Sequence, residues 1–251
     1  RSVSRGLGDV YKRQKLQMVS QEGKNVGVCA VRGNFDDAQS GVKRIFSDPI
    51  LREELARRGY FLSSANSINW GRLVPQIVYY VSSYATLAQQ GELNWGDPLN
   101  VVVPTGNFGN ILAAYYAKKM GVPIGKLICA SNINKVLTDF IQTGTYNRNR
   151  EFYATCSPSM DILISSNLER LLYLLTGEND AQIREWFQAL AETGTYTVSD
   201  SIQAVLKQEF YGGFCDDAAT KETIRKIYNT KIWIQCCKMI IGNLRLCVSY
   251  A

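Results

Sequence analysis

Short apolar runs alternate along this chain with longer segments in which apolar residues recur every three or four positions. Three runs rich in apolar residues predict buried strands, at 25–31, 101–103 and 126–131. Each is followed by a segment whose spacing predicts a helix, at 35–48, 110–120 and 136–146. Strands that alternate with helices predict an α/β fold with a mostly parallel sheet flanked by helices.

Helical spacing covers most of the remaining chain. The further segments that it predicts to be helical are 49–59, 71–91, 157–177, 180–194, 200–214 and 215–229. Those at 180–194 and 200–214 are interpreted as amphipathic helices that end in glycine. Because ligands of a parallel sheet bind beyond the carboxyl ends of its strands, the turns at Gly33, Gly106 and Ser131 should open on one edge.

The net charge of +6 resides at the two ends of the chain. Residues 1–14 hold four basic residues and one acid, residues 229–251 hold three basic residues and no acid, and residues 15–228 are neutral. A neutral body with basic ends is a poor candidate for nucleic-acid binding. No apolar run reaches the roughly 20 residues of a membrane span, so no membrane partner is expected.

The seven cysteines show no CxxC spacing, so no metal site is expected. Cys29, Cys129, Cys156 and Cys215 stand singly in apolar context, which is typical of reduced thiols inside a cell. A cytoplasmic location is therefore expected.

Both ends differ from the body in composition. Residues 1–14 lack periodicity and resemble translated adapter sequence, and residues 229–251 place three cysteines in an apolar stretch without acids, as translation in a wrong frame would. Both are interpreted as non-native; the alternative is a disordered arm and a buried C-terminal element. Between them we expect part of a smaller α/β domain at 15–71 and a cofactor-binding α/β domain at 72–228.

The stretch PTGNFGN at 104–110 joins a predicted strand to a predicted helix. Gly106 and Gly109 let the backbone approach a ligand and adopt positive φ where needed. The amides from Gly106 to Asn110 would lie at a helix N-terminus, which favours a phosphate, and Thr105 can add a hydroxyl donor. A Walker A loop is excluded because no Lys-Ser/Thr follows, and the spacing is not a dinucleotide fingerprint. The alternative is an ordinary tight turn.

A second polar stretch, SSANSINWGR at 63–72, gathers hydroxyl, amide and guanidinium donors at a helix start. Such a set suits a small anion such as a phosphate ester. The alternative is an ordinary Asn/Ser cap with a solvated arginine.

A third stretch, SPSMDILISSNLER at 157–170, carries Asp161, Asn167, Glu169 and Arg170 on what reads as one helical segment. Taken alone, it is explained by capping and surface ion pairs.

These three stretches, in this order, resemble the threonine synthases, pyridoxal-phosphate enzymes of fold type II. The resemblance covers 15–228 and is also carried by AVRGNFDDAQSGVK, ICASNINKVLTDF and ETIRKIYN. It implies a carbon–oxygen lyase of threonine biosynthesis that converts O-phospho-L-homoserine and water to L-threonine and phosphate. The implied cofactor is pyridoxal 5'-phosphate, an electron sink for carbanions.

The resemblance also implies roles for individual residues. The cofactor's phosphate would lie on a loop made of Thr105, Gly106, Asn107, Phe108, Gly109 and Asn110. The candidates for binding the substrate's phosphate are Ser67, Asn69 and Arg72.

The sequence departs from the family at both ends. No Phe-Lys-Asp motif, which would carry the Schiff-base lysine, is found, and the chain has no histidine. The Ser/Thr-Gly loop for the substrate carboxylate and the hydroxyl that contacts the pyridine nitrogen are missing as well. We therefore expect an incomplete interior fragment that is inactive by itself and holds no catalytic residue.

Two other interpretations stay open at this point. One is a non-catalytic relative that binds phosphate or pyridoxal phosphate, and the other is a different fold type II lyase, such as a dehydratase or a cysteine synthase. The sequence sets no oligomeric state.

Overall fold

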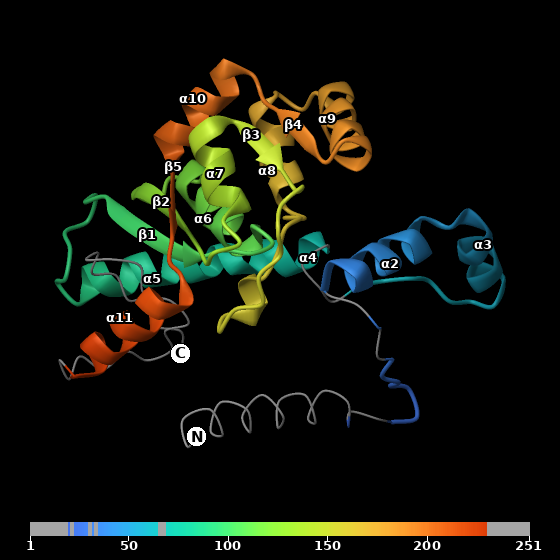
Figure 1. Ribbon diagram of the computed structural model, residues 1–251. Coiled ribbons are helices and arrows are strands. Elements are labelled where there is room, and N and C mark those ends of the chain that lie inside the picture. The colour runs from blue at the N-terminus through green and yellow to red at the C-terminus, as the bar shows by residue number, and fades with distance from the viewer. Residues whose placement is uncertain (1–19, 21–22, 30–31, 33–34, 65–68, 230–251) are drawn as a thin grey trace, which may run out of the picture. The chain divides into compact units, whose positions relative to one another are not determined.

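The structure is a computed structural model that describes residues 20, 23–29, 32, 35–64 and 69–229 (Figure 1). The chain divides into two compact units, 1–61 and 62–251. The ends interpreted as non-native lie outside the described residues, apart from Asn229. The division into domains at 15–71 and 72–228 stays a prediction.

The described residues of the first unit include two helices where helical spacing predicted them, α2 (Phe35–Ser47) and α3 (Pro49–Arg57). The Asp48 carboxylate caps α3 by accepting hydrogen bonds from the N–H groups of Ile50 and Leu51. Pro49, whose missing N–H costs nothing in a first turn, begins this helix.

The buried strand predicted at 25–31 is wrong for the residues described there. Residues 23–29 are exposed, and they form only an isolated bridge between Gly23 and Val26. An apolar run becomes a buried strand where neighbouring strands pair with it, and none pairs with it among the described residues.

The second unit holds the remaining elements. Its helices are α4 (Trp70–Leu73), α5 (Ile77–Gln89), α6 (Gly109–Lys119), α7 (Val136–Thr143), α8 (Leu168–Leu175), α9 (Asp180–Glu192), α10 (Asp200–Glu209) and α11 (Asp217–Asn229), with 3-10 turns η1 (Val74–Gln76) and η2 (Pro158–Met160). Its strands are β1 (Leu99–Pro104), β2 (Ile124–Ser131), β3 (Thr145–Asn147), β4 (Thr195–Thr197) and β5 (Phe210–Phe214). Among the described residues, no helix has the length and apolar character to cross a membrane.

Three strands form a parallel sheet in the order β1-β2-β5 (Figure 1). Its register aligns Val103 with Cys129, and Cys129 with Gly212. Because the strands are parallel, their carboxyl ends meet at one edge, where the turns at Gly106 and after Ser131 begin. The predicted α/β architecture with a parallel sheet is confirmed.

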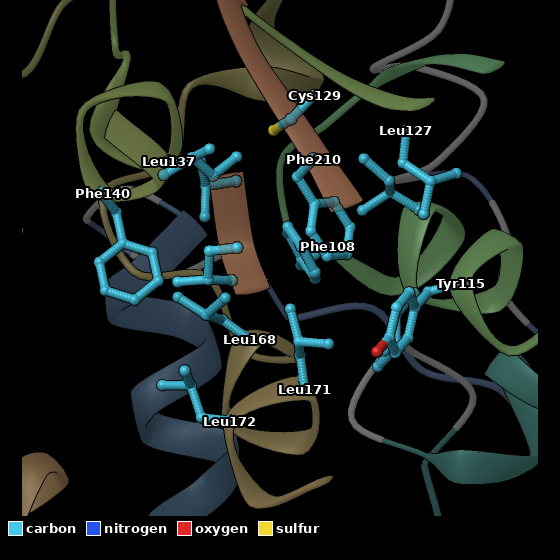
Figure 2. Close-up of a cluster of buried hydrophobic side chains, with 14 of the residues drawn as sticks. Phe108, Tyr115, Leu127, Cys129, Leu137, Phe140, Leu168, Leu171, Leu172 and Phe210 are labelled. Atoms are coloured by element: carbon cyan, nitrogen blue, oxygen red, sulfur yellow. The ribbon is translucent and has the colours of Figure 1, made fainter. Parts of the chain in front are cut away.

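The main core covers one face of this sheet (Figure 2). Side chains alternate along a strand, so Val103, Leu127 and Cys129 point into this core, whereas Val102 and Ala130 lie on the other face with Met160. Helices α6 and α7 pack on the sheet, and α6 also contacts α5 and α8. A helix enclosed in this way is apolar nearly all round, as α6 is.

The segment 200–214 is not one helix, contrary to the prediction. α10 ends at Glu209, and the residues after it form β5, the third strand of the parallel sheet. One of the glycines that read as a helix stop, Gly212, serves packing instead. A Cβ on Gly212 would lie 2.8 Å from Cα and 3.0 Å from O of Thr138, so α7 lies directly on the strand at this position.

Two other predicted helices differ from the structure, one because it is divided and the other because it begins later. The helix predicted at 71–91 is divided into α4, η1 and α5 around Pro75, which has no N–H to donate. The helix predicted at 157–177 begins only at Leu168. In addition, β3 and β4, which were not predicted, form an antiparallel pair in which Tyr146 stacks on Tyr196 with ring centroids 5.4 Å apart.

We predict that Gly212→Ala destabilises the second unit by about 1–3 kcal/mol, because the new methyl group overlaps the α7 backbone, which cannot move aside as a side chain can. Urea unfolding followed by circular dichroism measures the change. Tyr211→Thr, at an exposed position of the same strand, is the control and should change the free energy by less than about 0.5 kcal/mol. Equal effects of the two substitutions would contradict this account of Gly212.

Candidate functional site

The loop Thr105–Asn110 leaves the carboxyl end of β1 and enters α6. The Thr105 N–H donates to the Ala130 carbonyl at 2.9 Å, which continues the parallel pairing by one residue. The Thr105 hydroxyl is buried and donates to the Val103 carbonyl at 2.6 Å. Its single proton is thus used within the backbone, so the hydroxyl donor expected for a ligand is not offered in this arrangement.

Phe108, rather than Gly106 or Gly109, is the loop residue with a left-handed backbone conformation. It has φ 62° and precedes α6 as its N-cap residue, whereas the sequence suggested the glycines for such a conformation. The left-handed conformation costs a non-glycine residue about 1–2 kcal/mol. Complete burial of the ring beside Phe210, with centroids 5.6 Å apart, offsets that cost (Figure 2). The core therefore holds the turn in its shape.

The loop presents backbone donors at a helix N-terminus. Within the described part of the chain, the N–H groups of Gly106, Asn107, Phe108 and Gly109 have no hydrogen-bond acceptor. The first turn of α6 contains no acidic residue that would compete for them. Free N–H groups together with the positive end of a helix dipole form an anion site, and their number suits a phosphate group.

Gly106 is required because another part of the chain lies against it. A Cβ there would lie 2.8 Å from Cδ1 of Ile162 and 3.1 Å from the carbonyl oxygen of Ser159. At Gly109 the nearest atom would be the side-chain nitrogen of Asn167, at an ordinary 3.4 Å. The two glycines therefore differ: a side chain at Gly106 would force its neighbours to move, whereas one at Gly109 would make an ordinary contact.

The third sequence stretch holds the loop from this side. Ser165 Oγ donates to the Gly106 carbonyl at 2.8 Å. The N–H and side-chain amide of Asn167 both donate to the Asn107 carbonyl, at 3.0 and 2.9 Å. Ser165 and Asn167 are both buried, Asn167 completely.

Capping and surface ion pairs, the explanation favoured for this stretch from the sequence alone, do not describe it. Asp161 is buried, Asn167 precedes α8 and is bonded to the loop, and only Glu169 is exposed. Arg170 donates to Oδ1 of Asn167. The four residues thus do not share one helical segment.

Asn107 carries a buried acceptor without a donor. Its Oδ1 has no hydrogen-bond partner in the described part of the chain. Leaving such an atom unpaired costs about 1–3 kcal/mol. A ligand with an O–H or N–H donor near its phosphate would satisfy this oxygen, so the loop fits a phosphate ester that also carries a polar hydrogen.

Asn110 connects the loop to the second polar stretch rather than to a ligand. Its side-chain oxygen accepts from the Tyr80 hydroxyl at 2.5 Å, and its side-chain nitrogen donates to Gln76 Oε1 at 2.9 Å. Gln76 in turn donates to the Arg72 carbonyl. Gln76 and Tyr80 were not among the predicted site residues, although two polar groups four residues apart on a predicted helix were a usable signal.

The three residues predicted to bind the substrate's phosphate differ in what the structure shows of them. Ser67 lies outside the described residues. Asn69 caps α4 by accepting from the Gly71 N–H at 2.8 Å and donates to the Ser64 carbonyl at 2.6 Å, so it acts as the cap that was the alternative interpretation. Arg72 is exposed on α4.

Arg170 brings the start of α4 close to α8 and α6. Its guanidinium lies over the Trp70 ring at 5.7 Å, and Trp70 meets Tyr116 edge-on at 5.5 Å. Burial raises the pKa of the Tyr116 hydroxyl, and the nearby Arg170 charge partly reverses that rise. The described residues contain no cluster of three or more His, Cys, Asp or Glu side chains placed to hold a metal ion.

Similar curated proteins are named threonine synthase-like 1 or threonine synthase. Human threonine synthase-like 1 is 46% identical over 223 residues, which cover 88% of this chain and 30% of that protein. The threonine synthase of Eremothecium gossypii is 40% identical over 232 residues, covering 88% of this chain and 43% of that protein. No protein-family model matches the chain.

A crystal structure of threonine synthase from Brucella melitensis with bound pyridoxal phosphate has the same architecture. Its TM-score is 0.73 at 39% identity, and the match covers 88% of this chain and 45% of that one. The chain thus spans less than half the length of these three relatives. The resemblance to threonine synthases and the fold type II architecture are confirmed for the shared region.

We predict that Gly106→Ala destabilises the chain by about 1–3 kcal/mol, because the Ile162 side chain and the Ser159 carbonyl must both move to make space for a methyl group. Gly109→Ala is the matched control and should cost less than about 1 kcal/mol, since its nearest neighbour lies at an ordinary contact distance. Thermal and urea unfolding of both variants make the comparison. A larger loss for Gly109→Ala would contradict the packing described for Gly106.

Cys129 lies beneath the loop, and we predict that its thiol resists alkylation. Burial of the thiol away from water raises its pKa to about 12. At pH 9 the thiolate would be about one part in a thousand, so iodoacetamide should spare Cys129 while it labels the exposed Cys29. Peptide mass spectrometry reads the labelling, and denatured protein, in which Cys129 should react, is the control.

The same shift has a consequence for stability. The unfolded thiol loses its proton near pH 9, whereas the folded thiol keeps it until about pH 12. The folded state therefore binds the extra proton, and stability falls as pH rises through this window, by up to about 1.4 kcal/mol per pH unit. Cys129→Ala should reduce that slope; an unchanged slope, or rapid labelling of native Cys129, would contradict the buried thiol.

Proposed function

We propose that this chain is a segment of a threonine synthase and that its loop Thr105–Asn110 binds the phosphate of pyridoxal 5'-phosphate. The whole enzyme would convert O-phospho-L-homoserine and water to L-threonine and phosphate in threonine biosynthesis. The observation that carries the proposal is the row of N–H groups from Gly106 to Gly109 at the start of α6. It is supported by the identity of 40% to a threonine synthase over nearly the whole chain.

Each residue of the loop has a distinct part in this proposal. The backbone N–H groups of Gly106 to Gly109 bind the phosphate, and the buried Oδ1 of Asn107 accepts a hydrogen bond from a donor on the ligand. Thr105 fixes the first end of the loop through its hydrogen bond to the backbone. Asn110 fixes the other end through its hydrogen bonds with Tyr80 and Gln76. When bound, pyridoxal phosphate supplies an electron sink for carbanions.

We assign the substrate's phosphate to the Ser67, Asn69 and Arg72 stretch. Arg72 is an exposed residue, and a guanidinium can bind a phosphate through two parallel hydrogen bonds. Asn69 retains one amide proton beyond the one given to Ser64. The Gln76 side chain, which bonds both the Arg72 carbonyl and Asn110, ties this stretch to the cofactor loop.

The chemistry of the full reaction needs a lysine that this sequence does not carry in the expected Phe-Lys-Asp motif. We therefore infer that the 251-residue chain binds but does not turn over its substrate. A cytoplasmic location stays a prediction.

We predict that the purified chain binds pyridoxal phosphate more tightly than pyridoxal, by about tenfold or more, because only the former has the phosphate that the loop recognises. Equilibrium dialysis measures both affinities. The chain should release no phosphate from O-phospho-L-homoserine and show no visible band of lysine-bound cofactor. Equal affinities would contradict the phosphate site, and clear turnover would contradict the inferred lack of a catalytic lysine.

A non-catalytic phosphate-binding relative is the second candidate. The match to proteins named threonine synthase-like 1 is the observation that favours it. The contiguous genomic DNA on both sides distinguishes the two. A reading frame that carries the motif upstream supports the synthase, and a start codon near Lys15 supports the relative.

A further inference from the structure

We propose that Asp161 is a positioning residue for the loop Thr105–Asn110: its carboxylate fixes the segment 157–167, which sets the direction in which the loop presents its N–H groups. The identity of the ligand rests on the proposed function, whereas the role of Asp161 rests on the contacts described below. Asp161 does not contact the loop itself and acts through Ile162, Ser165 and Asn167.

The Asp161 carboxylate is buried and saturated with neutral donors. Its Oδ1 accepts from the side-chain amides of Asn132 and Asn134, at 2.7 and 3.2 Å, and from the Thr155 hydroxyl at 2.7 Å. Its Oδ2 accepts from the Thr155 N–H at 3.0 Å. The side chain is 8% exposed, so these bonds replace water almost completely.

The donors come from two parts of the chain, which the carboxylate joins. Asn132 and Asn134 directly follow β2 at the carboxyl edge of the parallel sheet, and Asn134 also bonds the backbone of Tyr153 in both directions. Thr155 precedes η2 and accepts from the Ser157 N–H. Asp161 thereby anchors the segment between β3 and α8 to the end of the sheet (Figure 1).

The anchored segment meets the loop immediately after Asp161. Ile162 and the Ser159 carbonyl lie against Gly106, as the space around that glycine shows. Ser165 then bonds the Gly106 carbonyl, and Asn167 bonds the Asn107 carbonyl twice. The packing and the hydrogen bonds therefore reach the loop from one side.

These bonds orient two peptide units. In a trans peptide the C=O and the following N–H point in opposite directions. The bond from Ser165 to the Gly106 carbonyl thus directs the Asn107 N–H away from the segment, and the bonds from Asn167 to the Asn107 carbonyl do the same for the Phe108 N–H. Both N–H groups belong to the row that has no acceptor within the described residues. A shift of the segment would rotate the donors that the anion needs.

The decisive experiment is hydrogen exchange on the full chain carrying Asp161→Asn. Asparagine keeps the shape of the aspartate side chain but places an NH₂ donor where the wild-type carboxylate accepts a hydrogen bond. One buried donor then faces another. Peptides that span 104–112 and 159–170 should exchange at least about fivefold faster, whereas peptides of α9 should be unchanged. Asp200→Asn, which alters an exposed carboxylate, is the matched control and should leave all these peptides as in the wild type.

Thr155→Val is the second variant, in case Asp161→Asn does not fold. It removes the hydroxyl donor to Asp161 but keeps the N–H donor, and it should accelerate exchange of the same peptides to a smaller extent. Wild-type exchange of the loop in a folded variant overturns the proposal. Equal acceleration of the loop and of α9 also overturns it, since that result means a general loss of stability.

Ligand binding supplies a separate readout. The preference for pyridoxal phosphate over pyridoxal should fall by about tenfold in Asp161→Asn and stay unchanged in Asp200→Asn. A wild-type chain without any such preference contradicts the proposed function, while the exchange data still decide the role of Asp161. A wild-type preference that Asp161→Asn retains in full, together with unchanged exchange, rejects Asp161 as a positioning residue.

Discussion

The hydrogen bonds that hold the Gly106 and Asn107 carbonyls are the constraint on which the rest of the site depends. A loop that binds an anion through N–H groups must direct those groups outward, and it can do so only if its carbonyls are held on the opposite side. Ser165 and Asn167 hold them. Because both side chains are buried, water has little access to compete for these hydrogen bonds.

Packing under the loop also holds it in this conformation. Phe108 accepts a left-handed backbone conformation because its ring is buried beside Phe210, the first residue of β5. That strand can lie where it does because Gly212 lets α7 approach its backbone. The third strand of the sheet, its glycine and the turn before α6 therefore depend on one another, although about a hundred residues of chain lie between the loop and Gly212. This is the sense in which a parallel sheet built from distant strands positions a site.

The sequence pattern predicted those features of the fold and the site that depend on residues close together in the chain. The glycine loop between an apolar run and a helix, the short helix that starts at Pro49 and the parallel α/β architecture all follow from neighbouring residues. The segment 200–214 was misread because its final glycines look like a helix stop, and only contact with Thr138 shows their purpose. The segment 157–170 was misread because Asp161 and Asn167 look like exposed helix residues, whereas their partners, Asn132 and Asn107, lie elsewhere in the chain. A polar side chain buried by a distant partner leaves no periodicity in the sequence.

A buried carboxylate next to an anion site needs an explanation, since like charges repel. Among the described residues no cation contacts Asp161; its partners are two amides, a hydroxyl and a backbone N–H. Four neutral dipoles can stabilise the charge without bringing in a cation that would draw the anion off the loop. An arginine in place of these donors would attract the phosphate to itself. The neutral donors do not, because their hydrogen bonds are already made to Asp161. The neutral donor set thus leaves the N-terminus of α6, which has no acidic residue in its first turn, as a source of positive potential for the ligand.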